Sequence, residues 1–129
     1  MGAIVAAMAL AGCSDGGEET VSAARAPAEI ARMVDSLERA TREGDYAAVC
    51  DELFSAEARE RAGGDDCESL LAEDAEGVTR PRLTLRSIEI DGDRAEARVR
   101  TAARGQTPAD ETIVFVREGG GYRISGLGG

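Results

Sequence analysis

Residues 83–90, LTLRSIEI, run through the turn Asp91-Gly92-Asp93 into residues 94–101, RAEARVRT. Apolar and polar residues alternate on both sides of this turn. A period of two residues around a turn that contains glycine predicts a β-hairpin. An Asp-Gly-Asp sequence also opens some calcium loops, but the later acidic positions of such a loop are missing, so a turn is expected here.

The two halves of the first predicted strand differ in parity. Leu83 and Leu85 are in step with each other, whereas Ile88 and Ile90 fall on the opposite parity. One strand keeps all four on one face only if a β-bulge lies near Arg86-Ser87. The returning strand turns small residues inward, which predicts a helix packed closely above them: Ala95, Ala97, Val99 and Thr101.

Two further strands complete the predicted sheet. Residues 112–116, TIVFV, are almost entirely apolar, which is typical of a central strand that is buried on both faces. A loop around residues 105–110 precedes this strand, and Gly119-Gly120-Gly121 turns it into a last strand at 122–124. The C-terminal half of the chain is therefore expected to form four strands.

The N-terminal half of the domain repeats its apolar residues at helical spacing. A helix is expected over 27–43, with Pro27 in its first turn and an apolar stripe of Ile30, Val34, Leu37 and either Ala40 or Thr41. Helices that precede strands in this order predict an α+β fold. We expect one domain over 27–129, in which N-terminal helices pack on a bent, mainly antiparallel four-stranded sheet.

Three shorter helices are expected between the long helix and the sheet. Asp45 is placed to cap a helix over 46–54, and Ser55 begins a turn or two through Arg61. After a break at Gly63-Gly64, a third helix extends to about Glu76. Asp65 and Glu68 have the spacing of a capping box at its start, and two leucines are expected to face inward, Leu70 and Leu71.

The first thirteen residues predict export and attachment to a membrane. Residues 1–12, MGAIVAAMALAG, form an apolar run that is too short to span a bilayer and fits a signal peptide. Leu10-Ala11-Gly12-Cys13 resembles the bacterial lipobox, which implies cleavage before Cys13, a diacylglycerol on its thiol and further acylation by a fatty acid such as palmitate. Residues 13–26 are then a flexible tether. The alternative is a short buried helix with an ordinary thiol at Cys13.

The other two cysteines, Cys50 and Cys67, form an even pair in a chain predicted to be exported. This context favours a disulfide over two free thiols. A redox or metal role is the alternative, but the chain has no CxxC spacing, and two thiolates do not complete a zinc site.

Composition argues against several classes of function. The net charge of −10, two Phe, two Tyr and no Trp argue against a nucleic-acid partner, which requires a basic face and aromatic platforms. The chain has no histidine, so the commonest zinc ligand and the commonest base at neutral pH are both missing. We expect no metal, no cofactor and no catalytic activity.

Several phrases together resemble a known family: Glu43 to Cys50, Leu53-Phe54-Ser55, the glycine break before Cys67, the turn at Gly92-Asp93, and the closing residues 120–127. They are similar to small actinobacterial-type envelope lipoproteins with a nuclear transport factor 2-like (SnoaL-like, cystatin-like) domain. The resemblance covers about residues 27–127. It implies a sheet that wraps around helices into a cone, and in enzymatic members this cone holds a ligand.

Two sets of side chains are candidates for a site. The four large aromatic residues either line a pocket or simply form the core: Tyr46, Phe54, Phe115 and Tyr122. The arginines of the hairpin form either a basic stripe or a solvated mixed face interrupted by Glu89 and Glu96; they are Arg86, Arg94, Arg98 and Arg100.

Two functions remain open. The favoured one is a membrane-anchored envelope lipoprotein, on the exported side, whose non-catalytic domain binds a protein partner or a second copy of itself. The alternative is a carrier of a small ligand, or a ketosteroid-isomerase-like enzyme, that uses the interior of the cone. Relatives of that enzyme place an Asp base and a Tyr or Asp donor inside the cone, but no motif in this chain matches those positions.

Overall fold

The computed structural model describes residues 14–128, and side chains from residue 25 onward. The predicted signal peptide and Cys13 lie outside these residues. Within them, no helix combines the length and the hydrophobicity that a bilayer-spanning segment requires. The elements follow in chain order as α1 (Ser14–Glu43), α2 (Tyr46–Ala48), η1 (Val49–Leu53), α3 (Ala56–Arg61), η2 (Gly64–Asp66), α4 (Cys67–Asp74), β1 (Arg82–Asp91), β2 (Arg94–Ala102), β3 (Ala109–Glu118) and β4 (Gly121–Gly128).

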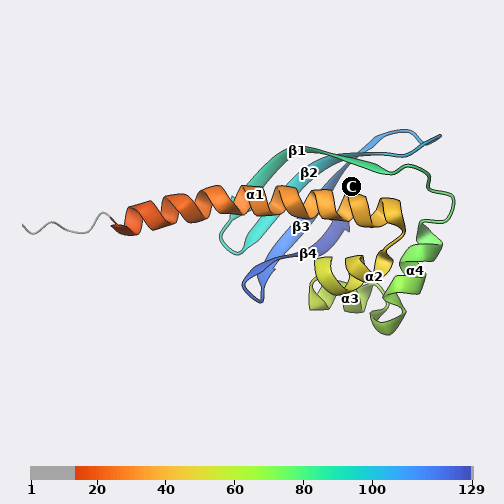
Figure 1. Cartoon of the computed structure of the whole chain (residues 1–129), viewed down its shortest axis with the longest axis horizontal. Helices are drawn as coiled ribbons and strands as arrows, with labels where there is room; N and C mark the ends of the chain where they lie inside the picture. The colour runs from red at the N-terminus through yellow and green to blue at the C-terminus, as the bar shows by residue number, and fades with distance from the viewer. Residues whose placement is uncertain (1–13, 129) are drawn as a thin grey trace, which may run out of the picture.

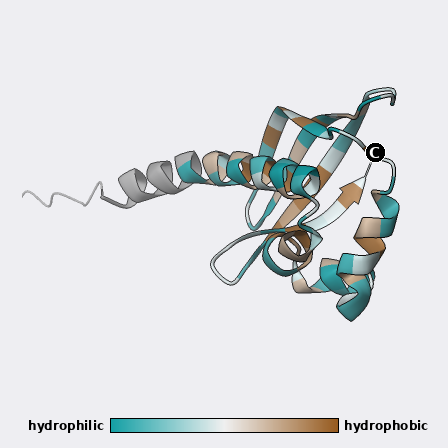
Figure 2. Cartoon of the chain, turned by 45° about the vertical axis from the view of Figure 1, so that its right-hand side comes forward, coloured by the Kyte–Doolittle hydropathy of each residue, from teal (hydrophilic) through white to brown (hydrophobic). Residues whose placement is uncertain are grey.

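The four strands form one antiparallel sheet in the order β1-β2-β3-β4. This sheet curves around α1, while the shorter helices gather at the C-terminal end of α1 (Figure 1). The α+β fold predicted from the order of helices and strands is therefore confirmed. Figure 2 shows the alternation of hydrophobic and hydrophilic residues along the strands that predicted the sheet.

The predicted bulge lies in β1. Leu85 pairs with Val99 and Ser87 with Arg98, so Arg86 is the extra residue. The extra residue reverses the alternation of side chains along β1. Ile88 therefore points to the same side of the sheet as Leu83 and Leu85, and all three pack against the core. Ile90 lies near the end of the strand and remains 39% exposed.

Helix α1 shares the main core with the sheet. Its buried stripe consists of Ala26, Ile30, Val34, Leu37 and Ala40. Ala95 and Ala97 on β2 are completely buried in the same core. Small side chains on the strand allow the helix to pack closely, as the sequence predicted.

Two carboxylates on α1 bind backbone groups at the two edges of the sheet. Glu29 Oε1 accepts a hydrogen bond from the backbone N–H of Tyr122 on β4, at 3.0 Å. Glu38 Oε2 accepts one from the N–H of Leu83 on β1, at 2.7 Å. These contacts join α1 to the beginning of β4 and to the beginning of β1, which lie at opposite ends of the sheet. The helix therefore crosses the sheet diagonally.

The predicted start of the first helix, at Pro27, is wrong. α1 begins at Ser14 and contains Pro27 in its interior, so the backbone of residues 14–26 is helical where a flexible tether was expected. Ala26 is only 4% exposed and belongs to the core. Pro27 lacks the N–H that an interior helical residue donates, whereas the alanines before it have a high helix propensity.

The turn before α4 also differs from the prediction. Gly64–Asp66 forms a 3₁₀ turn and α4 begins at Cys67, with no side-chain cap from Asp65 or Asp66. Gly63 has a positive φ of 121°, and a Cβ there would lie 2.5 Å from Leu70 Cδ1. Leu70 therefore folds against this glycine and is 41% exposed, whereas Leu71 packs on the core. The capping box and the inward orientation of Leu70 were wrong predictions.

Candidate functional site

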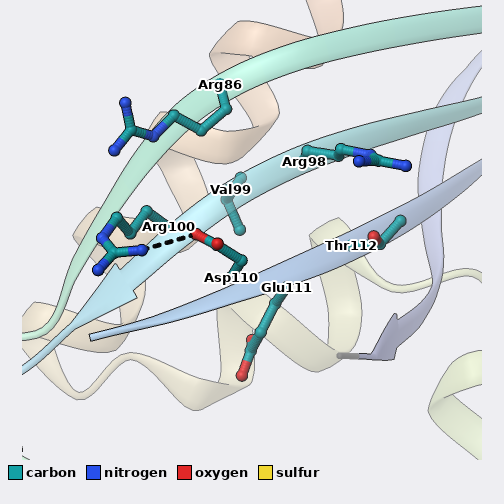
Figure 3. Close-up of a pocket in the computed structure, with 7 residues that line it drawn as sticks. All are labelled: Arg86, Arg98, Val99, Arg100, Asp110, Glu111 and Thr112. Atoms are coloured by element: carbon teal, nitrogen blue, oxygen red, sulfur yellow. Dashed lines mark hydrogen bonds and ion pairs between the residues drawn. The ribbon is translucent and has the colours of Figure 1, made fainter. Parts of the chain in front are cut away.

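The structure has two hollows of interest, on opposite faces of the sheet. The larger, of about 550 Å³, lies on the outer face between β1, β2 and β3. Figure 3 shows its lining, which includes Arg86, Arg98 and Arg100. We call it the arginine hollow. Two of the carboxylates on this face are paired, Asp110 with Arg100 at 3.0 Å and Glu96 with Arg94 at 3.5 Å.

The second hollow lies on the inner face and measures about 220 Å³. We call it the cone pocket. Helices α1 and α2, the segment after α4 and the four strands all contribute to its lining, which is mostly apolar: Leu37, Thr41, Tyr46, Ala75, Val78, Pro81, Leu83, Val99, Glu111, Ile113 and Leu127. A concave, mostly apolar pocket with few polar groups is the usual form of a small-molecule site.

Strand register explains how one carboxylate enters this apolar lining. Val99 on β2 pairs with Glu111 on β3, and Ala97 pairs with Ile113. Because alternate residues on a strand share a face, Glu111 lies on the same inner face as Ile113. The carboxylate is half-buried, and among the described residues Glu111 is the only charged one that lines the pocket.

The polar side chains of the cone pocket differ in whether they already form hydrogen bonds within the protein. The hydroxyl of Thr41 donates to backbone carbonyls of its own helix, Leu37 O and Glu38 O, each at 2.9 Å. Among residues 25–128, no hydrogen bond joins the Tyr46 hydroxyl or the Glu111 carboxylate to another group of the protein. One phenol and one carboxylate therefore remain to orient a ligand.

The four aromatic residues divide between pocket and core. Tyr46 lines the cone pocket. The other three are buried in the core and are absent from the lining, with exposures of 8% for Phe54, 0% for Phe115 and 3% for Tyr122. Sequence reasoning missed Glu111, because the strand was expected to begin at residue 112. An acidic residue two places before the apolar Ile113 was the available signal.

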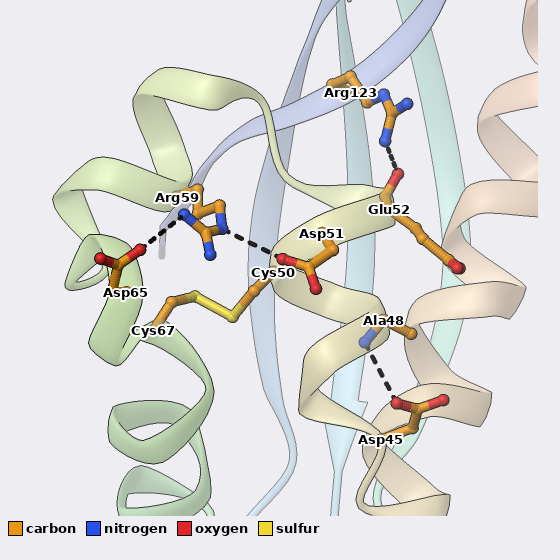
Figure 4. Close-up of polar contacts among 9 residues, drawn as sticks. All are labelled: Asp45, Ala48, Cys50, Asp51, Glu52, Arg59, Asp65, Cys67 and Arg123. Carbon is orange, nitrogen blue, oxygen red and sulfur yellow. Dashed lines mark hydrogen bonds and ion pairs between the residues drawn. A yellow bond between two sulfur atoms is a disulfide. The ribbon is translucent and has the colours of Figure 1, made fainter.

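A disulfide between Cys50 and Cys67 joins η1 to the start of α4 (Figure 4). Both cysteines are buried, at 2% and 1% exposure. Asp45 caps α2 by accepting from Ala48 N at 3.2 Å, as expected from the sequence. Because the far end of α4 brings Ala75 to the cone pocket, the disulfide helps to fix one wall of that pocket.

Polar contacts reinforce the same region. Arg59 lies between two acidic residues, with its Nε 3.2 Å from Asp51 and its Nη1 4.0 Å from Asp65. Arg123 on β4 donates to the backbone carbonyl of Glu52 (Figure 4). Ser55 N donates to Ile124 O at 2.8 Å, so the backbone after η1 covers the outer edge of β4.

The described residues contain no group of three or more His, Cys, Asp or Glu side chains that could hold a metal ion. The cone pocket contains one carboxylate and no second acidic group. Its lining therefore suits an organic molecule better than a cation that requires several oxygen ligands.

The helices and curved antiparallel sheet together form the α+β cone of nuclear transport factor 2-like (NTF2-like) proteins. A solved NTF-2 like protein of unknown function from Silicibacter pomeroyi DSS-3 is similar, with 21% identity and a TM-score of 0.63. The match covers 81% of this chain and 94% of that one. The de novo designed NTF2 fold protein NT-9 also matches, with 18% identity, a TM-score of 0.53, and coverage of 77% and 81%.

These similarities establish the fold alone. No model of a protein family matches the chain, and no curated protein matches it in sequence. A fold of this kind does not by itself imply a function, which depends on the residues of the site.

Proposed function

We propose that this protein is a membrane-anchored lipoprotein whose NTF2-like domain binds a small, largely apolar molecule in the cone pocket. The observation that supports the proposal best is the lining of this pocket. Its walls are apolar, and the half-buried carboxylate of Glu111 and the phenol of Tyr46 have no partner among the described residues. Such a pocket complements a hydrophobic body that carries one hydrogen-bond donor or one positive charge.

The exposure of apolar residues around the pocket is consistent with an occupant. Leu127 is 53% exposed and Val78 is 37% exposed, and both line the cone pocket. A bound apolar molecule covers such surface and stabilises the complex by removing it from water.

Filling the pocket tests the proposal. Ala75→Phe adds a ring to the pocket wall, and we expect it to weaken binding of the neutral probe N-phenyl-1-naphthylamine by about tenfold, measured by fluorescence titration of the full chain. Ala72→Phe is the matched control, because Ala72 lies three residues earlier, is exposed on α4 and does not line the pocket. Equal affinity of both variants for the probe contradicts binding in the cone pocket.

Glu111→Gln separates the role of charge from the role of shape. We expect this variant to bind the neutral probe unchanged and to lose about tenfold in affinity for the cationic probe 1-naphthylmethylammonium. Glu89→Gln, on the exposed outer part of β1, removes the same charge outside the pocket. If both variants lose the same affinity, the effect comes from overall charge and not from Glu111.

The second candidate function is proton transfer on a bound carbonyl compound. It is favoured by the presence of a carboxylate and a phenol in one apolar pocket, since such a pair can act as base and hydrogen-bond donor. Glu111-dependent hydrogen–deuterium exchange next to the carbonyl of a bound ketone distinguishes an enzyme from a carrier.

The proposed anchor has its own test. Cys13→Ala removes the thiol that would carry the lipid, and we expect the variant to leave the membrane fraction and enter the detergent-poor phase in detergent partitioning. The expectation rests on firm anchoring by two or more acyl chains. Cys50→Ala/Cys67→Ala, which keeps Cys13, should remain with the membrane. Retention of Cys13→Ala in the membrane contradicts the lipid anchor.

A further inference from the structure

The arginine hollow has an excess of positive charge in a chain whose net charge is −10. Three arginines line it, and only Arg100 is paired there, with Asp110 at 3.0 Å. Within residues 25–128, no ion pair joins Arg86 or Arg98 to a carboxylate. Two guanidinium groups therefore remain without a neutralising partner in one hollow.

The bulge in β1 determines where one of these charges lies. Arg86 is the extra residue of the bulge, so its side chain departs from the regular alternation of β1. Figure 3 shows the guanidinium groups of Arg86 and Arg100 on the same side of the hollow, while Arg98 extends along β2 toward the other side. The Glu111 side chain points away from these arginines, so its carboxylate does not neutralise them.

The chemistry of this lining matches a phosphate group. A guanidinium presents a planar fork of donors that binds phosphate oxygens in pairs. The lining carries an excess of positive charge, with three arginines against Asp110 and Glu111, and a phosphate monoester carries about −1.5 to −2 at neutral pH. Thr112, opposite Arg98 in the strand register, adds a hydroxyl to the same lining.

We propose that the arginine hollow, on the outer face of the sheet, binds a phosphate group through Arg86 and the free nitrogens of Arg100, which lie on the same side of the hollow, while Arg98 adds positive charge from the other side. The hollow opens on the face of the sheet opposite the cone pocket, and Val99 and Glu111 contribute to the lining of both. A volume of about 550 Å³ accommodates a phosphate together with the part of a molecule that carries it. The carrier is either a soluble phosphate compound or the headgroup of an anionic phospholipid.

Two probes distinguish these sources in the full chain carrying Cys13→Ala, which cannot be lipidated. Pyrophosphate binding is measured by calorimetry. Vesicle binding is measured by co-sedimentation with equal parts of phosphatidylglycerol and phosphatidylcholine. We expect at least one probe to bind, and Arg86→Ala to weaken that binding by about tenfold because a charge-assisted contact is lost. Arg98→Ala should weaken that binding less, because Arg98 lies on the other side of the hollow and adds only its charge.

Arg94→Ala is the matched control, since Arg94 lies on the same face of β2, is exposed, and is paired with Glu96 outside the hollow. We expect Arg94→Ala to bind as the parent does. Failure of both probes to bind overturns the proposal. Equal weakening by Arg86→Ala and Arg94→Ala also overturns it, because such binding depends on overall charge. All of these arginines are exposed or half-exposed, and unchanged thermal unfolding verifies that the variants fold.

Discussion

Phe115→Ala is expected to lower the free energy of unfolding by about 4 kcal/mol, the typical cost of removing a buried phenylalanine. Phe115 is completely buried on β3, where it pairs with Ala95 on one side and Ile124 on the other. The neighbouring alanines cannot extend into the space that the ring leaves, so a cavity persists. Chemical denaturation followed by circular dichroism measures the loss.

The adjacent Val116→Ala provides the control. Val116 lies on the outer face of the same strand and is only half-buried, so we expect a loss below about 1 kcal/mol. A loss for Phe115→Ala as small as that for Val116→Ala contradicts the placement of the ring in the core.

Removal of the disulfide is also expected to cause a large loss of stability. Cys50→Ala/Cys67→Ala is expected to lower the free energy of unfolding by about 3 kcal/mol, because the bridge closes a loop with a sequence separation of 17 residues. For a domain of this size, that loss lowers the melting temperature by roughly 15 °C. Alanine is preferred to serine, since both positions are buried and a serine hydroxyl there requires a partner.

Reduction of the parent protein supplies the control for this pair. Thorough reduction in denaturant, followed by melting under reducing conditions, should lower the melting temperature of the parent and leave that of the double variant unchanged. If reduction lowers both to the same extent, the effect does not come from the Cys50–Cys67 bridge.

Local patterns were sufficient to predict much of the sheet. The parity change between Leu85 and Ile88 identified the bulge, and the small residues on β2 predicted the close approach of a helix. Both features follow from the two-residue period of a β-strand, and a few consecutive residues are enough to reveal that period. The α+β class followed from the order of the elements alone.

Predictions failed where the structure depends on distant contacts. Leu70 was assigned to the core from its hydrophobicity, but the turn at Gly63 places it outside. Glu111 was missed because the strand was expected to begin at residue 112, whereas pairing across the sheet, here with Val99, extends β3 back to Ala109. The sequence left open whether the four aromatic residues line a pocket or form the core: Tyr46 lines the cone pocket, and the other three lie in the core.

The diagonal course of α1 has a consequence for how the chain folds. Glu29 is separated from Tyr122 by 93 residues, and Glu38 from Leu83 by 45. Contacts this distant in sequence are slow to form, because a long loop has to close before they stabilise anything. The long helix is synthesised before the sheet, yet its final position depends on β4. The core is therefore completed only when the C-terminal residues become available.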